Sequence, residues 1–440
     1  MAEASQAITH RRVLNIAVPI VLSNATVPIL GAVDTGVIGQ LGLAAPIGAV
    51  GIGAIILTSI YWIFGFLRMG TSGLTSQAHG AGQTGEVAAM LTRALMIGFA
   101  AGLAVIFLQI PVFWAAFQIA PASSEVESLA QDYMRIRVWS APAIITFYGV
   151  AGWLIALERT RAVLAIQVVT NSVNIVLDLW FVLGLDWGVE GVAWATFIAE
   201  WVGLGLGFWL CRDAFRQPAW RDWARILERK RLKLIISVNS DILLRTLMLE
   251  AIFVSFLFLG SDFGDVTLAA NQVLMQFLHI TAYAMDGFAL AAEALIGQAM
   301  GARDRPRLRR VAIMTSQWAG VTVVVLAALF ALLGGTIIDL MAKAPEVQQV
   351  ARTYLIYMVL APLAGAAAWM FDGIFIGATR SKDMRNMMAI SLAVYVVSVM
   401  ALVPAFGNHG LWLSLLISFV TRGITLGLRY PALERASAGR

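Results

Sequence analysis

The chain alternates long apolar stretches with short polar segments, at intervals typical of membrane-spanning helices. An apolar run of about 20 residues can cross a bilayer as a helix, whereas the strands of a membrane barrel alternate apolar and polar positions. Because the runs are continuous here, the pattern predicts an all-α integral membrane protein. Twelve spans are expected, at residues 13–38, 47–72, 89–113, 131–156, 162–184, 189–211, 233–260, 267–297, 310–334, 351–376, 387–404 and 409–428.

The sequence also contains an internal repeat with an offset of 221 residues. Leu74, Gln77, Ala78, Gly80 and Ala81 recur as Leu295, Gln298, Ala299, Gly301 and Ala302, and Gly152, Ile155 and Arg159 recur as Gly373, Ile376 and Arg380. Such self-similarity indicates two half-length copies, with six spans in each. Because six is even, both copies have the same orientation. We therefore expect a pseudo-two-fold axis along the membrane normal and a substrate cavity between two six-helix lobes.

Composition and charge support this architecture and predict its topology. Hydrophobic residues make up 60% of the chain and charged residues 13%, with a mean hydropathy of +0.80. Most Lys and Arg lie in alternate loops, so the net charge of +5 reflects membrane topology and not nucleic-acid binding. Both termini are expected on the cytoplasmic side of a bacterial inner membrane. The basic stretch 212–232 is expected to connect an N-terminal lobe, 1–211, to a C-terminal lobe, 233–440.

The fifth predicted span carries polar residues on one face. They are Gln167, Asn171, Asn174 and Asp178, at the spacing i, i+4, i+7 and i+11. Asp34 in the first span is expected to share the membrane depth of Asp178, and Thr196 in the sixth span adds a hydroxyl group. A charge inside the membrane costs about 2.5–3.5 kcal/mol on insertion scales, so such residues line a wet cavity, pair with one another or bind an ion.

Three interpretations of this constellation remain open from its chemistry. Two acids that share a partly desolvated site favour proton uptake by one of them, which makes the pair a proton carrier. The oxygens of Asp34, Asn174, Asp178 and Thr196 can instead bind Na+, the only metal that the sequence suggests. A hydrogen-bond network that only holds helices together is the third interpretation. At the repeat offset, Asp34 corresponds to Ser255, Asn174 to Tyr395 and Asp178 to Val399, so we expect one ion site and not two.

Five short motifs occur in order along the chain. They are Phe66-Leu-Arg-Met-Gly-Thr-Ser-Gly-Leu-Thr-Ser-Gln77, Asn174-Ile-Val-Leu-Asp178, Gly191-Val-Ala-Trp-Ala-Thr196 with Ala199-Glu200, Asp286-Gly-Phe288, and Glu293. On twelve spans, this order resembles the multidrug and toxic compound extrusion (MATE) family, and the first and the last two motifs resemble its DinF branch. The resemblance covers essentially the whole chain. It implies a V-shaped pair of six-helix lobes that exports drugs by alternating access, driven by inward flow of H+ or Na+.

The resemblance also implies roles for individual residues. Asp34 matches the coupling aspartate of the first span in the DinF branch, and Asn174, Asp178 and Thr196 match its partners in the fifth and sixth spans. Pro19 matches the first-span proline around which a bend on protonation has been proposed. We therefore expect Asp34 to carry the coupling ion and Pro19 to act as a hinge.

Ionisable residues also occur in the predicted spans of the second half. Glu250 resembles an acid that the NorM branch uses in its second lobe, but Asp372 is offset by about one turn from that branch's tenth-span aspartate, which disfavours a NorM-type cation site. Asp286 and Glu293 are seven residues apart on one helix face, where Arg245 is a candidate partner. They are interpreted either as a relay or cavity wall or as a structural salt-bridge cluster. The full set of candidate cavity or relay residues is Gln167, Asn171, Glu250, Asp286, Glu293 and Asp372.

These observations favour a secondary antiporter that exports amphipathic, cationic organic compounds, with H+ as the favoured coupling ion and Na+ as the alternative. A competing function is that of a lipid-linked precursor flippase of the same superfamily, which would be expected to have a basic central cavity and additional spans. An enzyme is not expected, because the sequence has no HExxH, serine-elbow or Walker pattern. The expected partners are small organic substrates and the bilayer, with no organic cofactor and a monomeric state.

Overall fold

The computed structural model describes residues 7–40, 43–119 and 123–438, and every regular element within them is helical. Twelve helical segments in these ranges are long and apolar enough to cross a membrane, which confirms the predicted fold class. They are His10–Gly39 (α1), Ala44–Gly80 (α2, η1 and α3), Thr84–Phe107 (α4), Ser124–Ala156 (α6, η2 and α7), Thr160–Gly184 (α8 and η3), Gly188–Leu210 (α9), Arg229–Ser261 (α12), Asp265–Gly301 (α13), Arg305–Met341 (α14), Pro345–Gly377 (α15), Ser381–Phe406 (α16) and Asn408–Ala436 (α17). Each predicted span corresponds to one of them.

Three of these segments are composite helices. Their parts are α2 (Ala44–Trp62), η1 (Ile63–Gly65) and α3 (Phe66–Gly80); α6 (Ser124–Arg137), η2 (Val138–Ser140) and α7 (Ala141–Ala156); and α8 (Thr160–Asp178) and η3 (Leu179–Gly184). A further short helix, α5 (Gln109–Ile119), follows α4.

Prolines account for two interruptions. A proline inside a helix lacks an N–H donor, and its ring clashes with the carbonyl group four residues earlier. Pro111 is four residues after Phe107, where α4 ends, so the predicted span 89–113 is divided at Leu108. Pro142 is likewise four residues after Val138, where the 3-10 turn η2 begins.

The chain forms two compact units. The first-half unit comprises residues 22–75 and 83–232, and the second-half unit comprises residues 1–21, 76–82 and 233–440. The predicted lobes 1–211 and 233–440 differ from these units, because parts of α1 and α3 belong to the second-half unit and the connector belongs to the first-half unit.

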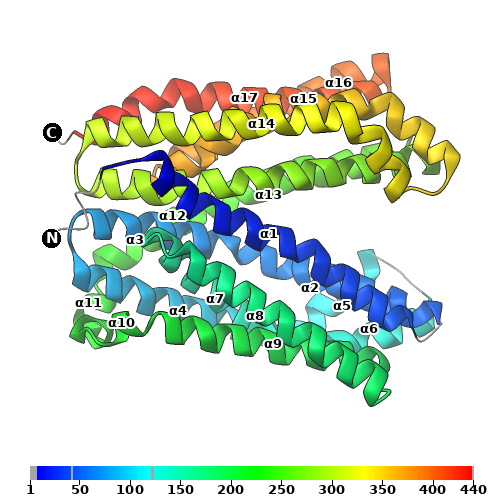
Figure 1. Cartoon of the computed structure of the whole chain (residues 1–440), viewed down its shortest axis with the longest axis horizontal. Coiled ribbons are helices and arrows are strands. Elements are labelled where there is room, and N and C mark those ends of the chain that lie inside the picture. The colour runs from blue at the N-terminus through cyan, green and yellow to red at the C-terminus, as the bar shows by residue number, and fades with distance from the viewer. Residues whose placement is uncertain (1–6, 41–42, 120–122, 439–440) are drawn as a thin grey trace. The chain divides into compact units, whose positions relative to one another are not determined.

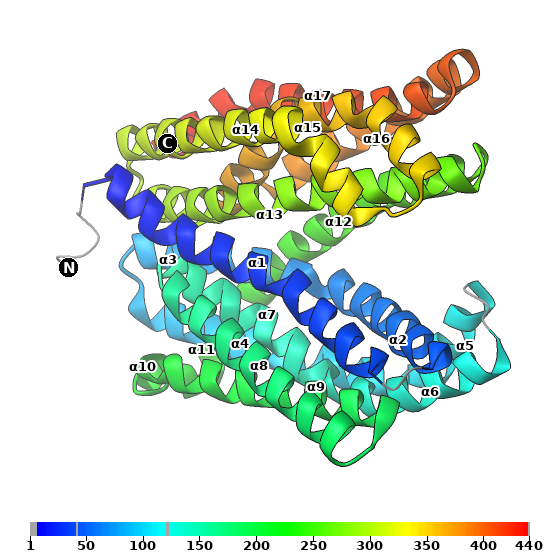
Figure 2. The same cartoon turned by 45° about the vertical axis from the view of Figure 1, so that its right-hand side comes forward.

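Within the first-half unit, α4 packs against α7, α8 against α9, and α2 against α6 (Figures 1 and 2). Its core includes Ile38, Leu57, Tyr133 and Val192. Within the second-half unit, α15 packs against α13, α14 and α17, and α16 packs against α17. Large side chains fill that core, among them Phe256, Phe277, Met358 and Trp412.

Each unit contains the same close helix contact at a repeated glycine. In the first-half unit, Gly152 of α7 lies against the backbone carbonyl group of Arg68 in α3. In the second-half unit, Gly373 of α15 lies against the carbonyl group of Ala289 in α13, which is the counterpart of Arg68 at the repeat offset. A Cβ atom at either glycine would clash with that backbone. The repeated glycine therefore preserves a helix contact that only small residues permit.

A second repeated motif packs against its own copy inside the second-half unit. Gly80 of α3 lies against the backbone carbonyl group of Gln298 in α13, and Gly301 of α13 lies against that of Gln77 in α3. The side chain of Gln77 also donates to the carbonyl group of Gly377 at 3.0 Å. The recurrence of these residues is explained by a reciprocal contact between the two copies.

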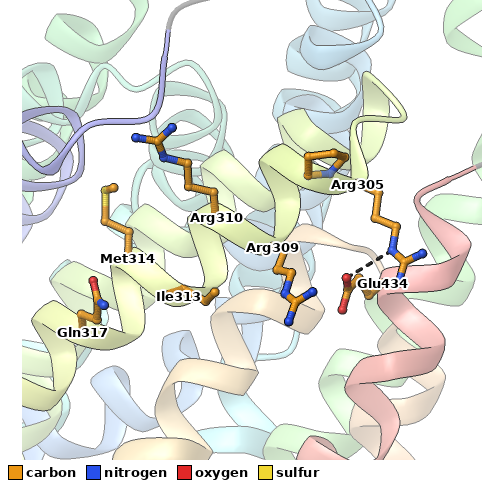
Figure 3. A pocket seen from close by; sticks show the side chains of 8 residues that line it. Arg305, Arg309, Arg310, Ile313, Met314, Gln317 and Glu434 are labelled. Carbon is orange, nitrogen blue, oxygen red and sulfur yellow. Dashed lines mark hydrogen bonds and ion pairs between the residues drawn. The ribbon is translucent and has the colours of Figure 1, made fainter.

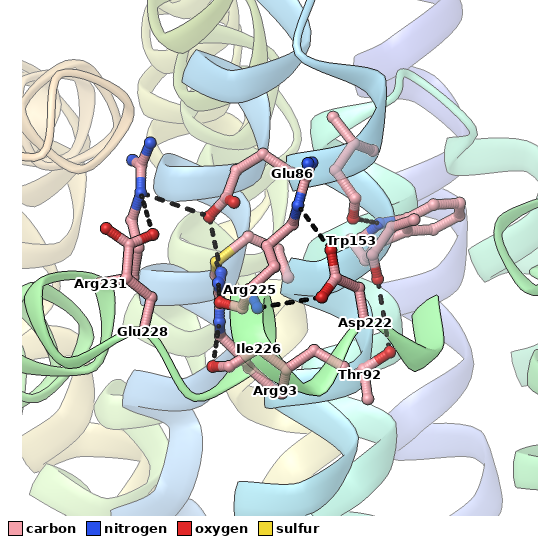
Figure 4. Close-up of polar contacts among 12 residues, drawn as sticks. Glu86, Thr92, Arg93, Trp153, Asp222, Arg225, Ile226, Glu228 and Arg231 are labelled. Carbon is pink, nitrogen blue, oxygen red and sulfur yellow. Dashed lines mark hydrogen bonds and ion pairs between the residues drawn. The ribbon is translucent and has the colours of Figure 1, made fainter. Parts of the chain in front are cut away.

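The predicted connector 212–232 is folded and anchored to α4 in the first-half unit (Figure 4). It contains the short elements α10 (Arg212–Phe215), η4 (Pro218–Arg221) and α11 (Trp223–Ile226). The buried side chain of Arg93 donates through Nε to the carbonyl group of Ile226 at 2.9 Å and through Nη2 to that of Arg225 at 2.6 Å. Glu86 accepts from Nη1 of the same arginine at 2.6 Å. An arginine on the terminal carbonyl groups of a short helix stabilises its end.

Candidate ion-coupling site

The polar face predicted for the fifth span lies on α8, in the first-half unit. Asn174 and Asp178 have no exposed surface, and Asn171 is 7% exposed. Gln167 is half-buried and donates through Nε2 to Oδ1 of Asn171 at 2.9 Å. These four polar residues therefore divide into an outer pair, Gln167 and Asn171, and an inner pair, Asn174 and Asp178.

The structure brings the four predicted coupling residues together around the amide group of Asn174. The orientation of this amide is assigned from its hydrogen bonds, with Nδ2 donating to Oδ2 of Asp178 at 3.0 Å and to Oδ1 of Asp34 at 3.1 Å. On its other side, Oδ1 accepts from Oγ1 of Thr196 at 2.9 Å. Three helices thus meet at one amide, since Asp34 lies on α1 and Thr196 on α9.

The carboxyl groups of Asp34 and Asp178 lie close enough to interact directly with one another. Asp34 is partly exposed, whereas Asp178 is fully buried and its Oδ1 atom has no hydrogen-bond partner. A buried polar atom without a partner is costly, and it commonly marks a place where a ligand, an ion or a proton is handled. No group of three or more His, Cys, Asp or Glu side chains able to hold a metal ion occurs within the described ranges.

Local backbone structure explains why these side chains meet. The π-helical turn η3 begins directly after Asp178, and such turns often occur at functional sites. Gly191 of α9 lies against this turn, because a Cβ atom there would be 3.2 Å from the backbone carbon of Phe181. The glycine of the Gly191–Thr196 motif therefore permits the close approach of α9 that places Thr196 beside Asn174.

A buried ion pair in the same unit was not anticipated from the sequence. Arg137 of α6 pairs with Glu200 of α9, and both side chains are largely buried. Arg137 also donates to Oη of Tyr133 at 3.3 Å and to Oγ of Ser140 at 3.2 Å. Its positive charge interacts with Asp34. Arg137 and Glu200 are both ionisable and both lie inside predicted spans, and this feature of the sequence could have indicated a buried ion pair.

The predicted second-half residues do not join this network. Arg245 of α12 pairs with Asp372 of α15, and not with Asp286 or Glu293 as expected. Arg422 of α17, another residue that the sequence analysis missed, lies 3.7 Å from the same carboxylate. We call these three side chains the Arg-Asp-Arg cluster: Arg245, Asp372 and Arg422. All three are at least nine-tenths buried.

The remaining candidates occupy other positions of the second-half unit. Glu250 is partly exposed on α12 and interacts electrostatically with Arg245. Asp286 is half-buried on α13, and Glu293 of the same helix is 1% exposed. Pro19 is buried within α1, which continues through it as a helix.

Comparisons with known proteins assign the chain to a family. A model of the MatE family matches residues 19–180 and 242–402, one segment in each half. The chain is 38% identical over 413 residues to "DNA damage-inducible protein F" of Escherichia coli (strain K12), covering 94% of this chain and 90% of that protein. It is 27% identical over 458 residues to the "Probable multidrug resistance protein NorM" of Xanthomonas campestris pv. campestris, with coverage of 96% and 93%.

Solved structures support the same assignment at the level of the fold. The MATE transporter VcmN of Vibrio cholerae in its bent form matches with a TM-score of 0.86 at 20% identity, over 97% of each chain. The family match covers most of this chain in two repeated segments, and the Escherichia coli relative extends it to nearly the full length. The chain therefore belongs to the MatE family of multidrug and toxic compound efflux transporters.

Proposed function

We propose that this protein is a proton-coupled antiporter that exports amphipathic, cationic organic compounds by alternating access. The proposal rests on one observation: the carboxyl groups of Asp34 and Asp178 meet at the amide of Asn174 inside a membrane-spanning unit. The protein would act as a monomer in a bacterial inner membrane, with both termini in the cytoplasm.

The chemistry of the carboxyl pair supports H+ as the coupling ion. Two neighbouring carboxylates in a partly desolvated site repel one another when both are ionised, so proton uptake by one of them is favoured. Such a pair takes up and releases protons as a unit. A pair with one proton carries one negative charge, and a second proton neutralises it.

The orientation assigned to the Asn174 amide from its hydrogen bonds favours H+ over Na+. A sodium site needs several oxygen atoms that converge on the ion, as hard cations require. Asn174 directs Nδ2 at both carboxyl groups and turns Oδ1 toward Thr196. An amide nitrogen cannot bind a cation, so in this orientation Asn174 contributes no oxygen ligand between the two carboxyl groups.

Exchange follows from competition for the negative charge. Asp34 is partly exposed whereas Asp178 is fully buried, so Asp34 is the group that solvent and substrate can reach. A cationic substrate beside Asp34 favours loss of the proton, and protonation from the outer side favours loss of the substrate. Each state of the site thus holds either the proton or the drug.

We further propose that α1 bends near Pro19 during this exchange. Residues of α1 up to Val21 belong to the second-half unit, and residues from Leu22 onward belong to the first-half unit. Pro19 lacks the N–H that would bond to the carbonyl group of Asn15, so the helix is weakened close to this division.

The test uses purified protein in proteoliposomes, with a pH gradient imposed without Na+ and then a Na+ gradient imposed at equal pH. We expect dye transport to follow the pH gradient alone, and we expect drug addition to release protons from the purified protein but not from Asp34→Asn. An absolute requirement for Na+ would overturn the choice of ion. Transport that ignores both gradients would overturn antiport itself.

A further inference from the structure

A basic pocket lies between α14 and α17 in the second-half unit, and none of its lining residues is assigned to coupling (Figure 3). Its volume is about 670 Å³. The residues that line it are Arg305, Pro306, Arg309, Arg310, Ile313, Met314, Gln317 and Glu434. Three arginines and one glutamate give the lining an excess of positive charge.

Two of the three guanidinium groups have no acidic partner. Arg305 forms an ion pair with Glu434, from Nε to Oε1 at 3.1 Å. Arg309 and Arg310 are exposed and form no ion pair within the part of the chain that the structure describes. Figure 3 shows Arg309 extending from the side of α14 that faces Glu434, and Arg310 extending from the other side of the helix. Both guanidinium groups line the pocket, and their planar donors are available to an anion there.

The apolar surface next to these arginines follows one face of α14. Ile313, which is 50% exposed, begins this face, and Val321 and Val324 continue it at 55% and 60% exposed. With Gln317 they follow the spacing i, i+4, i+8 and i+11, so they lie on one side of the helix. The basic residues occupy the first turns of α14, which begins at Arg305 on the predicted cytoplasmic side. Positive charge thus lies next to a strip of exposed apolar surface on a membrane-spanning helix.

We propose that this pocket binds the phosphate group of an anionic phospholipid, with an acyl chain along the Ile313–Val324 face of α14. Guanidinium groups bind phosphate through paired, charge-assisted hydrogen bonds. Basic pockets between membrane helices on the cytoplasmic side bind anionic headgroups. A free phosphate ion would share the headgroup chemistry, but only a lipid also uses the apolar strip. The inference is independent of the coupling ion and of the exported substrate.

The test measures binding of fluorescent short-chain phosphatidylglycerol to the full-length purified protein in detergent, with phosphatidylcholine as the neutral comparison. For Arg309→Gln/Arg310→Gln we expect phosphatidylglycerol affinity to fall about tenfold or more, because each basic residue near an anionic lipid contributes substantially. The matched control is Arg229→Gln/Lys230→Gln, which removes two exposed charges at the start of α12, outside the pocket lining. Its affinity should remain within about twofold of the wild type.

Two further variants keep the proposal testable if the arginine variant does not fold. Glu434→Gln frees Arg305 from its ion pair and should tighten phosphatidylglycerol binding. Ile313→Ser should weaken lipid binding without changing competition by inorganic phosphate. Equal loss of affinity in the pocket variant and the control variant would overturn the proposal, as would equal binding of the two lipids. If inorganic phosphate competes as strongly as lipid and Ile313→Ser has no effect, the pocket binds a free anion and the lipid assignment is wrong.

Discussion

Two buried polar clusters, one in each unit, are built in opposite ways. In the first-half unit, the carboxyl groups of Asp34 and Asp178 meet at one neutral amide. In the Arg-Asp-Arg cluster of the second-half unit, one carboxylate lies between two guanidinium groups. The first arrangement has negative charge that a cation can neutralise, whereas the second already has more positive than negative charge. Repeat-related halves have therefore kept one helix contact, at Gly152 and Gly373, while their polar interiors have diverged.

The comparison indicates that the first cluster exchanges ions and the second stabilises its unit. An arginine cannot lose its proton in a protein, so the Arg-Asp-Arg cluster cannot alternate between charge states as a carboxyl pair can. Substitutions in each cluster test these two roles. They are given in order of decreasing expected change in free energy.

Asp372→Asn should have the largest effect on stability. The substitution removes the carboxylate that pairs with both Arg245 and Arg422 and leaves two buried positive charges together. Breaking a buried ion pair from one side typically costs about 3–5 kcal/mol. Thermal unfolding of the detergent-purified protein should show the loss, and Arg245→Gln/Asp372→Asn should recover part of it. A protein with wild-type stability and no transport would instead give Asp372 a direct role in exchange.

Asp34→Asn should abolish transport while leaving the protein folded. We expect a loss of roughly a hundredfold in pH-driven dye transport, about 2.7 kcal/mol in activation free energy, because the variant cannot exchange a proton at this position. The substitution removes one of two neighbouring carboxyl groups and their mutual repulsion, so thermal stability should be unchanged or higher. The matched control is Ser255→Ala at the repeat counterpart, which should transport normally. Dye export by Asp34→Asn at the wild-type rate would exclude this residue as the coupling group.

Asp178→Asn should impair coupling by about tenfold, because Asp34 would retain a titratable group but lose the partner that shares its proton. The repeat counterpart of Asp178 is Val399, which packs against the core of the second-half unit. Val399→Ala should therefore reduce transport by less than about twofold and cost only packing energy. Proteoliposome transport rates at one fixed pH gradient compare the two variants. Similar losses in both would indicate two equivalent sites.

Much of this organisation could be predicted from the sequence, and the failures have a common cause. The twelve spans follow from apolar runs, because burying backbone polar groups in lipid requires helices. The polar face of α8 follows from helical spacing alone. Spacing cannot say which helix packs opposite, however, so Arg245 was assigned to Asp286 or Glu293 on α13 when its partner is Asp372 on α15. The pairing of Arg137 with Glu200 was missed for the same reason. Helix-helix register depends on tertiary packing that no single segment encodes.

Thr196→Val should have the smallest of these effects, and it tests whether the amide of Asn174 is held in one orientation. The hydroxyl group of Thr196 lies 2.9 Å from Oδ1 of Asn174 and also 2.9 Å from the carbonyl oxygen of Val192 in its own helix, and the substitution removes the contact with Asn174. A lost hydrogen bond of this kind costs about 1 kcal/mol, so we expect transport to fall about fivefold while substrate binding is largely retained. The control is Thr35→Val on α1, whose hydroxyl bonds only to the carbonyl group of Gly31 in its own helix, at 2.9 Å. Proton release on drug addition should decrease in Thr196→Val and stay normal in the control. If both variants release protons like the wild type, Thr196 only fills space and the orientation of Asn174 is set by the two carboxyl groups alone.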